Sequence, residues 1–585
     1  MKTTMHVGRN LWRPLVIFSI VLSLQLATQV AFSQDGITRY VRFSDDSGTH
    51  SGILDGNTIR VLDGDPVFDD GVSPTGSAVA VGSVDLEIPM NPERVPNVMG
   101  VAGNSNNPNG QQIDVNHPRW FGKANTSLAK NGSPVEVPYG ATNFNFEGEL
   151  GLIIGREGRH IPESEAMNYL FGVTVGNDWS ENDWCGERRG VEEPTHVFCK
   201  AGDTFATLGD AVVTGLDLTD LQISVRLNGV LAAQGTSADF RDSPASLISK
   251  ISHYVTLKRG DIIFTGTVAP PQMRGTRRQL WQEDVVEVEI ENVGAVSNQL
   301  VRVTRQNVSG PEISAADGTY VRFQYEGGTA FGVLNGNEVS ELDGDPIGGN
   351  ASMTGQTFDV SDIELGLPLD PAKPGRKVLA AAANYQPTNA PPRQVPHPRF
   401  LFKRSTSLSN DGNVVERPPE VEMFIPEGEL VLVVGRRGRH IPVNEVNDYI
   451  FGVAAGNDWS ELSWITAGPG PRPLKYVSKA TDTWAGIANQ IVRGIDYSDL
   501  QITTHVNGEL LSQGQSSTMI NNPARLVSYL SRYMTLEPGD LIYTGAISPE
   551  PGMRSNLQVG DRVTVQVEGL GSMEQQVVAM PAWPH

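Results

Sequence analysis

Hydrophobic and polar residues alternate along much of this chain, in short runs that close on turn residues. Two such runs are LQISVRLNG from Leu221 and DVVEVEIENV from Asp284. A period of two with many β-branched residues is typical of strands that bury one face. Short helices are predicted in SPASLISKISHYV and in PESEAMNYLFG, where Pro162 can open the first turn. The pattern therefore predicts β-rich domains with few helices.

The whole pattern occurs twice, at an offset of 280 residues. TRYVRFSDDSGTHSGILDGN from Thr38 corresponds to GTYVRFQYEGGTAFGVLNGN from Gly318, and FGVTVGNDWSE corresponds to FGVAAGNDWSE. The chain of 585 residues also exceeds the roughly 250 to 300 residues over which a single core keeps growing. We therefore expect two homologous domains with a linker between them, over residues 37–305, 317–583 and 306–316 respectively.

The N-terminal segment has the features of an export signal. Basic residues such as Arg9 and Arg13 precede the apolar stretch PLVIFSIVLSLQLATQVAFSQ, and Ala31 and Ser33 form a small-residue cleavage pattern. We expect a signal peptide over residues 1–33 and a secreted or periplasmic mature chain; an uncleaved anchor is the alternative. No other segment is long and apolar enough to span a bilayer, so no stable membrane insertion is expected after cleavage.

Composition narrows the possible partners. The formal net charge is −22 at pH 7, and binding to a phosphate backbone needs a basic face, so no nucleic-acid partner is expected. A content of 39% hydrophobic residues is ordinary for a soluble globular protein.

Two glutamates stand two residues apart at the start of the apolar run ELGLIIG. In a strand, residues i and i+2 point to the same side, so Glu147 and Glu149 present their carboxylates together. Such a pair alone is common on solvated strands, but Asp178 follows 29 residues after Glu149. The second repeat keeps the same spacing with Glu427, Glu429 and Asp458. Carboxylates in this arrangement indicate a site for a hard divalent cation, Mg²⁺ or Mn²⁺ first and Ca²⁺ as a further candidate, rather than for zinc.

Several motifs in a fixed order resemble the fumarylacetoacetate hydrolase family over nearly the whole of each repeat. They are FEGELGLIIG, FGVTVGNDWS, KAGDTFATLGD, VRLNG, LISKISHYVTLKRGDIIFTGT and VEVEIENVG, and the second repeat has counterparts of each. The resemblance implies a β-rich α+β fold, a mixed β-roll with flanking helices, and a cation on the six carboxylates named above. Because family members commonly pair as dimers, the two repeats are expected to pair within one chain as a pseudo-dimer.

The resemblance also implies roles for individual residues. Lys200 and Lys479 match the family's active-site lysine, which would stabilise charge or transfer a proton. Proton transfer near neutral pH requires a lysine whose pKa is lowered by burial or by a nearby cation. Residues matching the family's substrate-contacting turn are Thr265, Gly266 and Thr267 in the first repeat and Thr544 and Gly545 in the second, where Ala546 replaces the last threonine.

The chain departs from the family pattern at two places. Hydrolytic members carry a water-activating His and Glu after a GxNY stretch, and neither repeat has them. Pro108, Gln111, Thr388 and Pro391 occupy these positions instead. None of these is a competent general base near neutral pH. The family's arginine after NDxS is also replaced, in the first repeat by Glu181, so recognition of a substrate carboxylate is left open.

The function favoured by these residues is that of a secreted, metal-dependent enzyme. Its substrate is expected to be a small 2-oxo or enolisable carboxylic acid, and its reaction a C–C lyase, decarboxylase, tautomerase or hydrolase step through a metal-bound enolate. Loss of the dyad favours the steps that need only an enolate sink over hydrolysis. Two alternatives stay open: a non-catalytic metal- and ligand-binding homologue, and a chain in which only the first domain is active.

Cys185 and Cys199 are the only cysteines, and both lie between Asp178 and Lys200. In an exported protein they can close a disulfide. A pair of free core thiols is the equal alternative.

Overall fold

The computed structural model describes residues 36–105, 118–185, 197–268, 280–304, 306–387, 391–392, 395, 397–466, 475–550 and 556–581. The expected signal peptide, residues 1–33, lies outside these ranges, and so do Pro108, Gln111 and Thr388. Within the described ranges, no helix is both long and apolar enough to cross a membrane.

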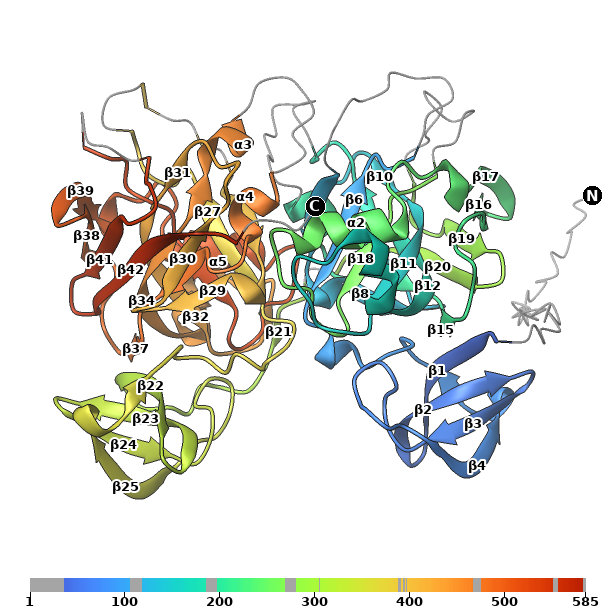
Figure 1. The fold of residues 1–585 in the computed structure, drawn as a ribbon, viewed down its shortest axis with the longest axis horizontal. Coiled ribbons are helices and arrows are strands. Elements are labelled where there is room, and N and C mark those ends of the chain that lie inside the picture. The colour runs from blue at the N-terminus through green and yellow to red at the C-terminus, as the bar shows by residue number, and fades with distance from the viewer. Residues whose placement is uncertain are drawn as a thin grey trace, which may run out of the picture. The chain divides into compact units, whose positions relative to one another are not determined.

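Each repeat contains one large mixed sheet. In the first repeat its order is β4 (Pro74–Ala80), β3 (Thr58–Leu62), β2 (Gly48–Asp55), β1 (Thr38–Asp45), β15 (Ala211–Thr214), β12 (Leu170–Asp178), β11 (Gly148–Ile154), β18 (Ile262–Phe264), β6 (Val98–Ala102) and β7 (Arg119–Lys123). Strands β5 (Asp85–Leu86), β8 (Leu128–Lys130) and β14 (Ala206–Leu208) attach beside this path. Figure 1 shows β1 to β4 as a ladder at one end of the repeat.

A five-stranded sheet accompanies the large one. Its order is β17 (Val230–Thr236), β16 (Gln222–Leu227), β19 (Val285–Ile290), β20 (Gly294–Arg302) and β9 (Val135–Val137). A two-stranded pair, β10 (Phe144–Asn145) with β13 (Ser180–Glu181), lies beside the predicted metal ligands in sequence. The helices of this repeat are short: α1 (Val197–Lys200), α2 (Pro244–Ser252) and the 3-10 helix η4 (Glu163–Tyr169).

The second repeat has the same topology. Its large sheet runs β25 (Met353–Asp359), β24 (Glu338–Leu342), β23 (Gly328–Asn335), β22 (Gly318–Tyr325), β37 (Gln490–Arg493), β34 (Ile450–Asp458), β32 (Gly428–Val434), β40 (Leu541–Tyr543), β27 (Val378–Ala382) and β28 (Arg399–Lys403). Its smaller sheet runs β30 (Val414–Arg417), β42 (Gly571–Ala579), β41 (Arg562–Val567), β38 (Gln501–Val506) and β39 (Glu509–Gln515). Its helices are α3 (Leu462–Thr466), α4 (Val477–Ala480) and α5 (Pro523–Leu530). The predicted β-rich class with two like domains is confirmed.

Strand β11 shows why a glycine separates the two glutamates. All of its residues are buried, and Leu150 belongs to the same core cluster as Val225 of the smaller sheet. A Cβ on Gly148 would lie 2.5 Å from Val225 Cγ2, so only glycine lets the two sheets approach this closely. The Glu-Gly-Glu motif therefore places two carboxylates on one side of the chain and, on the other side, a glycine that lets the smaller sheet pack closely.

The two short helices predicted from the sequence are both present. The segment from Pro244 is an α-helix, capped by Ser243, whose side chain accepts a hydrogen bond from the Ser246 N–H. The segment after Pro162 is also a short helix, of the 3-10 type, over Glu163–Tyr169. The strand β12 begins at the next residue, which leaves little length for α-helical hydrogen bonds.

The two repeats contact each other through reciprocal hydrogen bonds. Asp203 accepts from Thr535, at 3.0 Å from its N–H and 2.7 Å from its hydroxyl. Asp482 accepts from Thr256 in the same way, at 2.8 and 2.6 Å. Each residue of the second pair is the repeat counterpart of one in the first, so the contact has the character of a two-fold dimer interface. The expected pairing within one chain is therefore present among the described residues.

The connection between the repeats is itself part of the structure. Within the segment expected to be a linker, β21 (Val308–Ser309) pairs antiparallel with β33 (Gly438–Arg439) of the second repeat. The Gly310 N–H also donates to the Arg437 carbonyl at 2.8 Å. The segment is therefore fixed to the second repeat rather than a free tether.

Candidate active site

Two antiparallel strands bring the predicted carboxylates of the first repeat together. Strand β11 begins directly after Glu147, β12 ends at Asp178, and the register pairs Glu149 with Gly176. The Asp178 N–H donates to the Glu147 carbonyl at 2.8 Å, which extends the pairing of the two strands by one hydrogen bond. One carboxylate oxygen from each of Glu147, Glu149 and Asp178 lies within 4.8 Å of the others. The sequence spacing thus corresponds to a real cluster.

Lys200 lies in the centre of this cluster. It ends the short helix α1, and its Nζ is 2.5 Å from Glu147 Oε2 and 2.5 Å from Asp178 Oδ2. The ammonium group also lies 4.7 Å from the centre of the Phe121 ring, a cation–π distance. The lysine identified from the KAGD motif therefore bridges two of the three carboxylates.

A second lysine in the cluster was missed by the sequence analysis. Lys123 ends β7, has a fully buried side chain, and donates to Asp178 Oδ1 and, at 2.5 Å, to the carbonyl of Lys200. It has a counterpart 280 residues later in Lys403, whose Nζ is 2.5 Å from Asp458 Oδ1. That recurrence in the repeat alignment was the available signal. Lys123 is a positioning residue, because it holds both the aspartate and the backbone that carries Lys200.

The turn expected to bind substrate lies against the carboxylate cluster. The Gly266 N–H donates to Glu149 Oε2 at 2.7 Å, so this backbone group orients a carboxylate of the cluster. The Thr265 hydroxyl is buried and donates to the Leu150 carbonyl at 3.1 Å, and the Thr267 hydroxyl lies 3.5 Å from the Val268 carbonyl. Thr265 therefore holds the end of β18 to β11, and the main chain of Gly266 contacts the cluster.

The charges of the cluster shift the pKa values of its members. Burial raises the pKa of Glu149 well above its ordinary value, and the negative charges of Asp178 and Glu147 add to the effect. Burial also acts to raise the pKa of Asp178, but the two neighbouring lysines outweigh it and leave that pKa below its ordinary value. Burial acts to lower the pKa of Lys200, yet the three carboxylates raise it above the ordinary value. Burial lowers the pKa of Lys123 to about 8. Of the two lysines in the first cluster, Lys123 therefore has the lowered pKa and Lys200 the raised one.

The second repeat contains the corresponding cluster with one difference. Lys479 donates to Glu427 and to Asp458, and the Gly545 N–H donates to Glu429 Oε2 at 2.6 Å. The Thr544 hydroxyl donates to the Leu430 carbonyl at 2.9 Å, as its counterpart does in the first repeat. The Ser460 hydroxyl additionally donates to Glu427 Oε2. Among the described residues, the condition that all three ligand oxygens lie within 4.8 Å of one another is met by the first triad.

A divalent cation fits the first cluster. The three carboxylates carry more charge than the two lysines beside them can neutralise. The excess falls on Glu149, which is 1% exposed, accepts from the Gly266 N–H and forms no ion pair with any described lysine or arginine. Carboxylate oxygens are the donors that hard cations prefer. Glu147, Glu149 and Asp178 would hold such an ion.

Glu181, where the family pattern has an arginine, is fully buried next to the cluster in sequence. Its two carboxylate oxygens each accept from the Asn143 N–H at 3.0 Å. Burial raises its pKa to about 7. Glu181 therefore supports the β10–β13 pair and supplies no positive charge for a substrate carboxylate. Of the four positions of the missing dyad, Pro391 lies within the described residues and is exposed.

The two cysteines form a disulfide. Cys185 and Cys199 are bonded with their Cα atoms 5.3 Å apart, which resolves the alternative left open by the sequence. Cys199 immediately precedes Lys200 on α1. The bond therefore ties the lysine-bearing turn to the segment that follows β13. The counterpart positions, Ile465 and Ser478, cannot form such a bond.

These features define a class: a tandem pair of mixed-sheet domains. In each domain a Glu-Gly-Glu motif, an aspartate and a lysine come together at the ends of two central strands of the main sheet. Residues 93–301 and 375–578 match the family model for the fumarylacetoacetate (FAA) hydrolase C-terminal domain, over more than half of the chain. The chain belongs to the fumarylacetoacetate hydrolase family. The preceding residues of each repeat, 38–89 and 319–368, match a model described as Rv2993c-like, N-terminal.

Individual relatives share both repeats or one of them. The 4-hydroxyphenylacetate degradation bifunctional isomerase/decarboxylase of Escherichia coli is 27% identical over 465 residues, which are 79% of this chain and 90% of that protein. The mitochondrial oxaloacetate tautomerase FAHD2A of Homo sapiens is 34% identical over 190 residues, 32% of this chain and 59% of that protein. Among solved structures, a 5-carboxymethyl-2-hydroxymuconate delta-isomerase from Mycobacterium smegmatis is 28% identical with a TM-score of 0.40, and the match covers 45% of this chain and 100% of that one.

Proposed function

We propose that this chain catalyses isomerisation or decarboxylation of a small 2-oxo or enolisable carboxylic acid and depends on a divalent cation, Mg²⁺ or Mn²⁺. The observation that carries the proposal is the buried cluster in which Lys200 bridges Glu147 and Asp178 while Glu149 is left without a cationic partner. A site with surplus buried negative charge is suited to hold a cation, and the lysine beside it is suited to handle charge or a proton.

Each residue of the cluster would have its own role. Glu147, Glu149 and Asp178 hold the cation, and the Gly266 N–H keeps Glu149 in position. When bound, such a cation supplies positive charge that stabilises an enolate of a 2-oxo acid. The three carboxylates raise the pKa of Lys200, so at neutral pH it would act as a fixed positive charge.

The type of reaction follows from the absent dyad and from the relatives. Hydrolysis needs a base that activates water, and neither repeat has the His and Glu that would serve. The relatives with tandem or single matching repeats carry the names isomerase/decarboxylase and oxaloacetate tautomerase. Decarboxylation forms the enolate as carbon dioxide leaves and then needs a proton on carbon, whereas isomerisation also needs a group that first removes a carbon-bound proton. Neither reaction needs an activated water.

A comparison of three reactions tests the proposal. Purified full-length protein is assayed for oxaloacetate decarboxylation, oxaloacetate tautomerisation and acylpyruvate hydrolysis, each with Mg²⁺, with Mn²⁺ and with a chelator. We expect one of the first two to exceed hydrolysis and to disappear on chelation. Cation binding without turnover of any of these would favour the binding homologue, and chelator-resistant turnover would contradict the role of the carboxylates.

We further propose that the first repeat is the main catalyst. In the second repeat Ser460 occupies an oxygen of Glu427, and Ala546 replaces Thr267. The Ser460 contact leaves one oxygen of Glu427 less available to a cation, and Ala546 lacks the hydroxyl that Thr267 could offer to a substrate. Separate inactivation of the two lysines distinguishes the repeats.

We also propose that the mature chain is secreted or periplasmic, after removal of residues 1–33. The apolar N-terminal stretch and the Cys185–Cys199 disulfide support this, since such bonds persist in oxidising compartments. N-terminal sequencing of protein from the medium or periplasm of an expressing cell tests it. A cytosolic protein that keeps its initiating methionine and apolar stretch would contradict it.

A further inference from the structure

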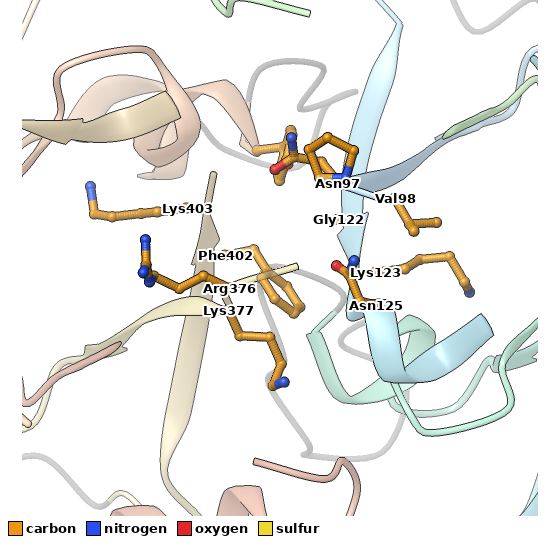
Figure 2. Close-up of a pocket in the computed structure, with 11 residues that line it drawn as sticks. Asn97, Val98, Gly122, Lys123, Asn125, Arg376, Lys377, Phe402 and Lys403 are labelled. Carbon is orange, nitrogen blue, oxygen red and sulfur yellow. The ribbon is translucent and has the colours of Figure 1, made fainter. Parts of the chain in front are cut away.

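The two repeats enclose a small pocket where they meet. Figure 2 shows Asn97 and Lys123 of the first repeat on one side of it and Lys377, Phe402 and Lys403 of the second on the other. Lys123 and Lys403 extend in opposite directions, each toward the aspartate of its own repeat. Around this pocket the two repeats differ at several corresponding positions, and two of these pairs decide how a buried aspartate is neutralised. These pairs are Asn97 with Lys377 and Ala124 with Arg404.

In the first repeat, a buried aspartate takes its cation from the other repeat. Asp261 has a fully buried side chain, and its Oδ1 accepts from the Asn97 amide at 2.7 Å. Its Oδ2 is 2.6 Å from Arg404 NH2, and the Arg404 side chain is also fully buried. The charge of Asp261 is therefore neutralised across the interface.

In the second repeat, the corresponding aspartate takes its cation from its own repeat. Asp540 Oδ2 is 2.8 Å from Lys377 Nζ, and both side chains are 1% exposed. The Lys377 N–H donates to the other oxygen of Asp540 at 2.8 Å. The position that corresponds to Arg404 holds Ala124, which is buried and carries no charge.

These four positions balance only when a first repeat faces a second repeat. In the chain, Asp261 is paired with Arg404 and Asp540 with Lys377, while the buried Arg376 beside Asp540 donates to the Gly539 and Asp370 carbonyls. Two first repeats facing each other would bury two copies of Asp261 with no cation. If two second repeats faced each other, each Asp540 would lie near its own Lys377 and near Arg404 of the facing repeat. This would leave surplus buried positive charge. An uncompensated buried charge is strongly destabilising in either sign.

A second contact between the repeats also lacks a symmetric counterpart. His253 of the first repeat lies with Nε2 2.7 Å from Glu420 Oε1 of the second. The reverse contact does not exist, because the position corresponding to Glu420 is Gly140. The two-fold interface is therefore asymmetric at more than one place.

We propose that Asn97, Ala124, Lys377 and Arg404 make the face of each repeat selective for the other repeat. The face around Asp261 accepts only a partner domain of this family that brings an arginine to that carboxylate. The face around Asp540 accepts only a partner domain without one. The pairing partner is thus specified by the placement of two cations, in addition to the contacts that both halves of the interface share.

Charge-relocation variants of the full-length chain test this proposal. Lys377→Met with Arg404→Met removes the ion-pair partners of both buried aspartates, and Asn97→Lys with Ala124→Arg adds two cations beside the existing ones. Each pair is expected to lower the thermal unfolding midpoint by roughly 5 °C or more. Arg562→Met is the matched control, because Arg562 forms an exposed ion pair with Glu574 and its loss should shift the midpoint by about 1 °C or less.

The decisive variant reverses the arrangement by combining Asn97→Lys, Ala124→Arg, Lys377→Asn and Arg404→Ala. It restores the balance with the roles of the repeats exchanged, so its midpoint should exceed that of both unbalanced variants although it carries more substitutions. A midpoint equal to or below theirs would overturn the proposal, and so would a wild-type midpoint in the unbalanced variants.

A smaller variant keeps the test valid if the buried Ala124→Arg change prevents folding. Arg404→Met removes the cation of Asp261, and Asn97→Lys then supplies one from the same repeat, as Lys377 does for Asp540. Recovery of at least about half of the lost midpoint supports the proposal. Failure of Asn97→Lys to recover any of the loss overturns it.

Discussion

The Gly266 N–H donates to Glu149 Oε2, and glycine is required at this position. Gly266 has a φ of +95°, and a Cβ there would lie 2.8 Å from the Cβ of Asn104. We expect Gly266→Ala to lower the free energy of unfolding by about 2 kcal/mol and to weaken Mn²⁺ binding. Urea unfolding and calorimetric titration measure the two effects. Gly229→Ala is the control: its φ is +78° with nothing within 4 Å, so it should keep its cation affinity.

Glu149→Gln tests the cation site directly. The change removes one ligand charge while keeping the shape, so affinity for Mg²⁺ or Mn²⁺ in the first repeat should fall about tenfold or more. Calorimetric titration of the full-length chain measures it, with the exposed strand residue Glu289→Gln as control. Unchanged affinity would remove Glu149 from the site.

The two active-site lysines should differ in importance. Lys200→Met is expected to reduce the metal-dependent turnover of the chain by about 100-fold or more, because no other described group bridges Glu147 and Asp178 in the same way. Lys479→Met should reduce the turnover much less, since in the second cluster the Ser460 hydroxyl donates to Glu427 Oε2. Steady-state rates of the two variants with the same substrate decide between them. Equal losses would mean that both repeats contribute.

The disulfide should matter for stability and for the position of Lys200. Cys185→Ser with Cys199→Ser opens a loop of about 15 residues, which corresponds to roughly 3 kcal/mol in the chain-entropy model. Unfolding of the wild type with and without reductant should show a similar difference, whereas the double variant should not respond to reductant. A wild type that is indifferent to reductant would show that the bond contributes nothing to stability.

Glu181 predicts a pH dependence of stability. Burial raises its pKa from the ordinary 4.5 to about 7 in the folded chain. The folded state thus keeps a proton that the unfolded state releases, so stability is fully present below the unfolded pKa and falls as pH rises toward 7. Glu181→Gln should remove this part of the slope. Urea unfolding at about pH 5 and about pH 8 measures it, and an unchanged slope would mean that another group is responsible.

The carboxylates could be found from the sequence because their positions follow from strand periodicity and from an identical spacing in both repeats. Glu147 and Glu149 share a strand face by the period of two, and Asp178 recurs at the same distance. Lys123 could not be assigned a role in this way, because nothing in its own strand shows which aspartate it reaches. Its partner is set by the tertiary packing of β7 against the end of β12.

The direction of individual side chains was also beyond the sequence. Thr265 and Thr544 match a substrate-binding motif, but their hydroxyls donate to carbonyls of the neighbouring strand. The motif gave no information on which atom of the turn faces the cluster. The same limit applies to Asp261, whose cation comes from a residue 143 positions away in the other repeat.

The segment β21, which pairs with β33, makes the association of the two repeats independent of dilution. In a dimer of separate chains, the fraction of assembled protein falls as the concentration falls below the dissociation constant. Here each repeat meets its partner at the effective concentration set by a short fixed connection, which is orders of magnitude above that of the free protein in solution. The interface contacts of Asp203 and Asp482 therefore persist at any abundance of the protein, and assembly requires no encounter between molecules.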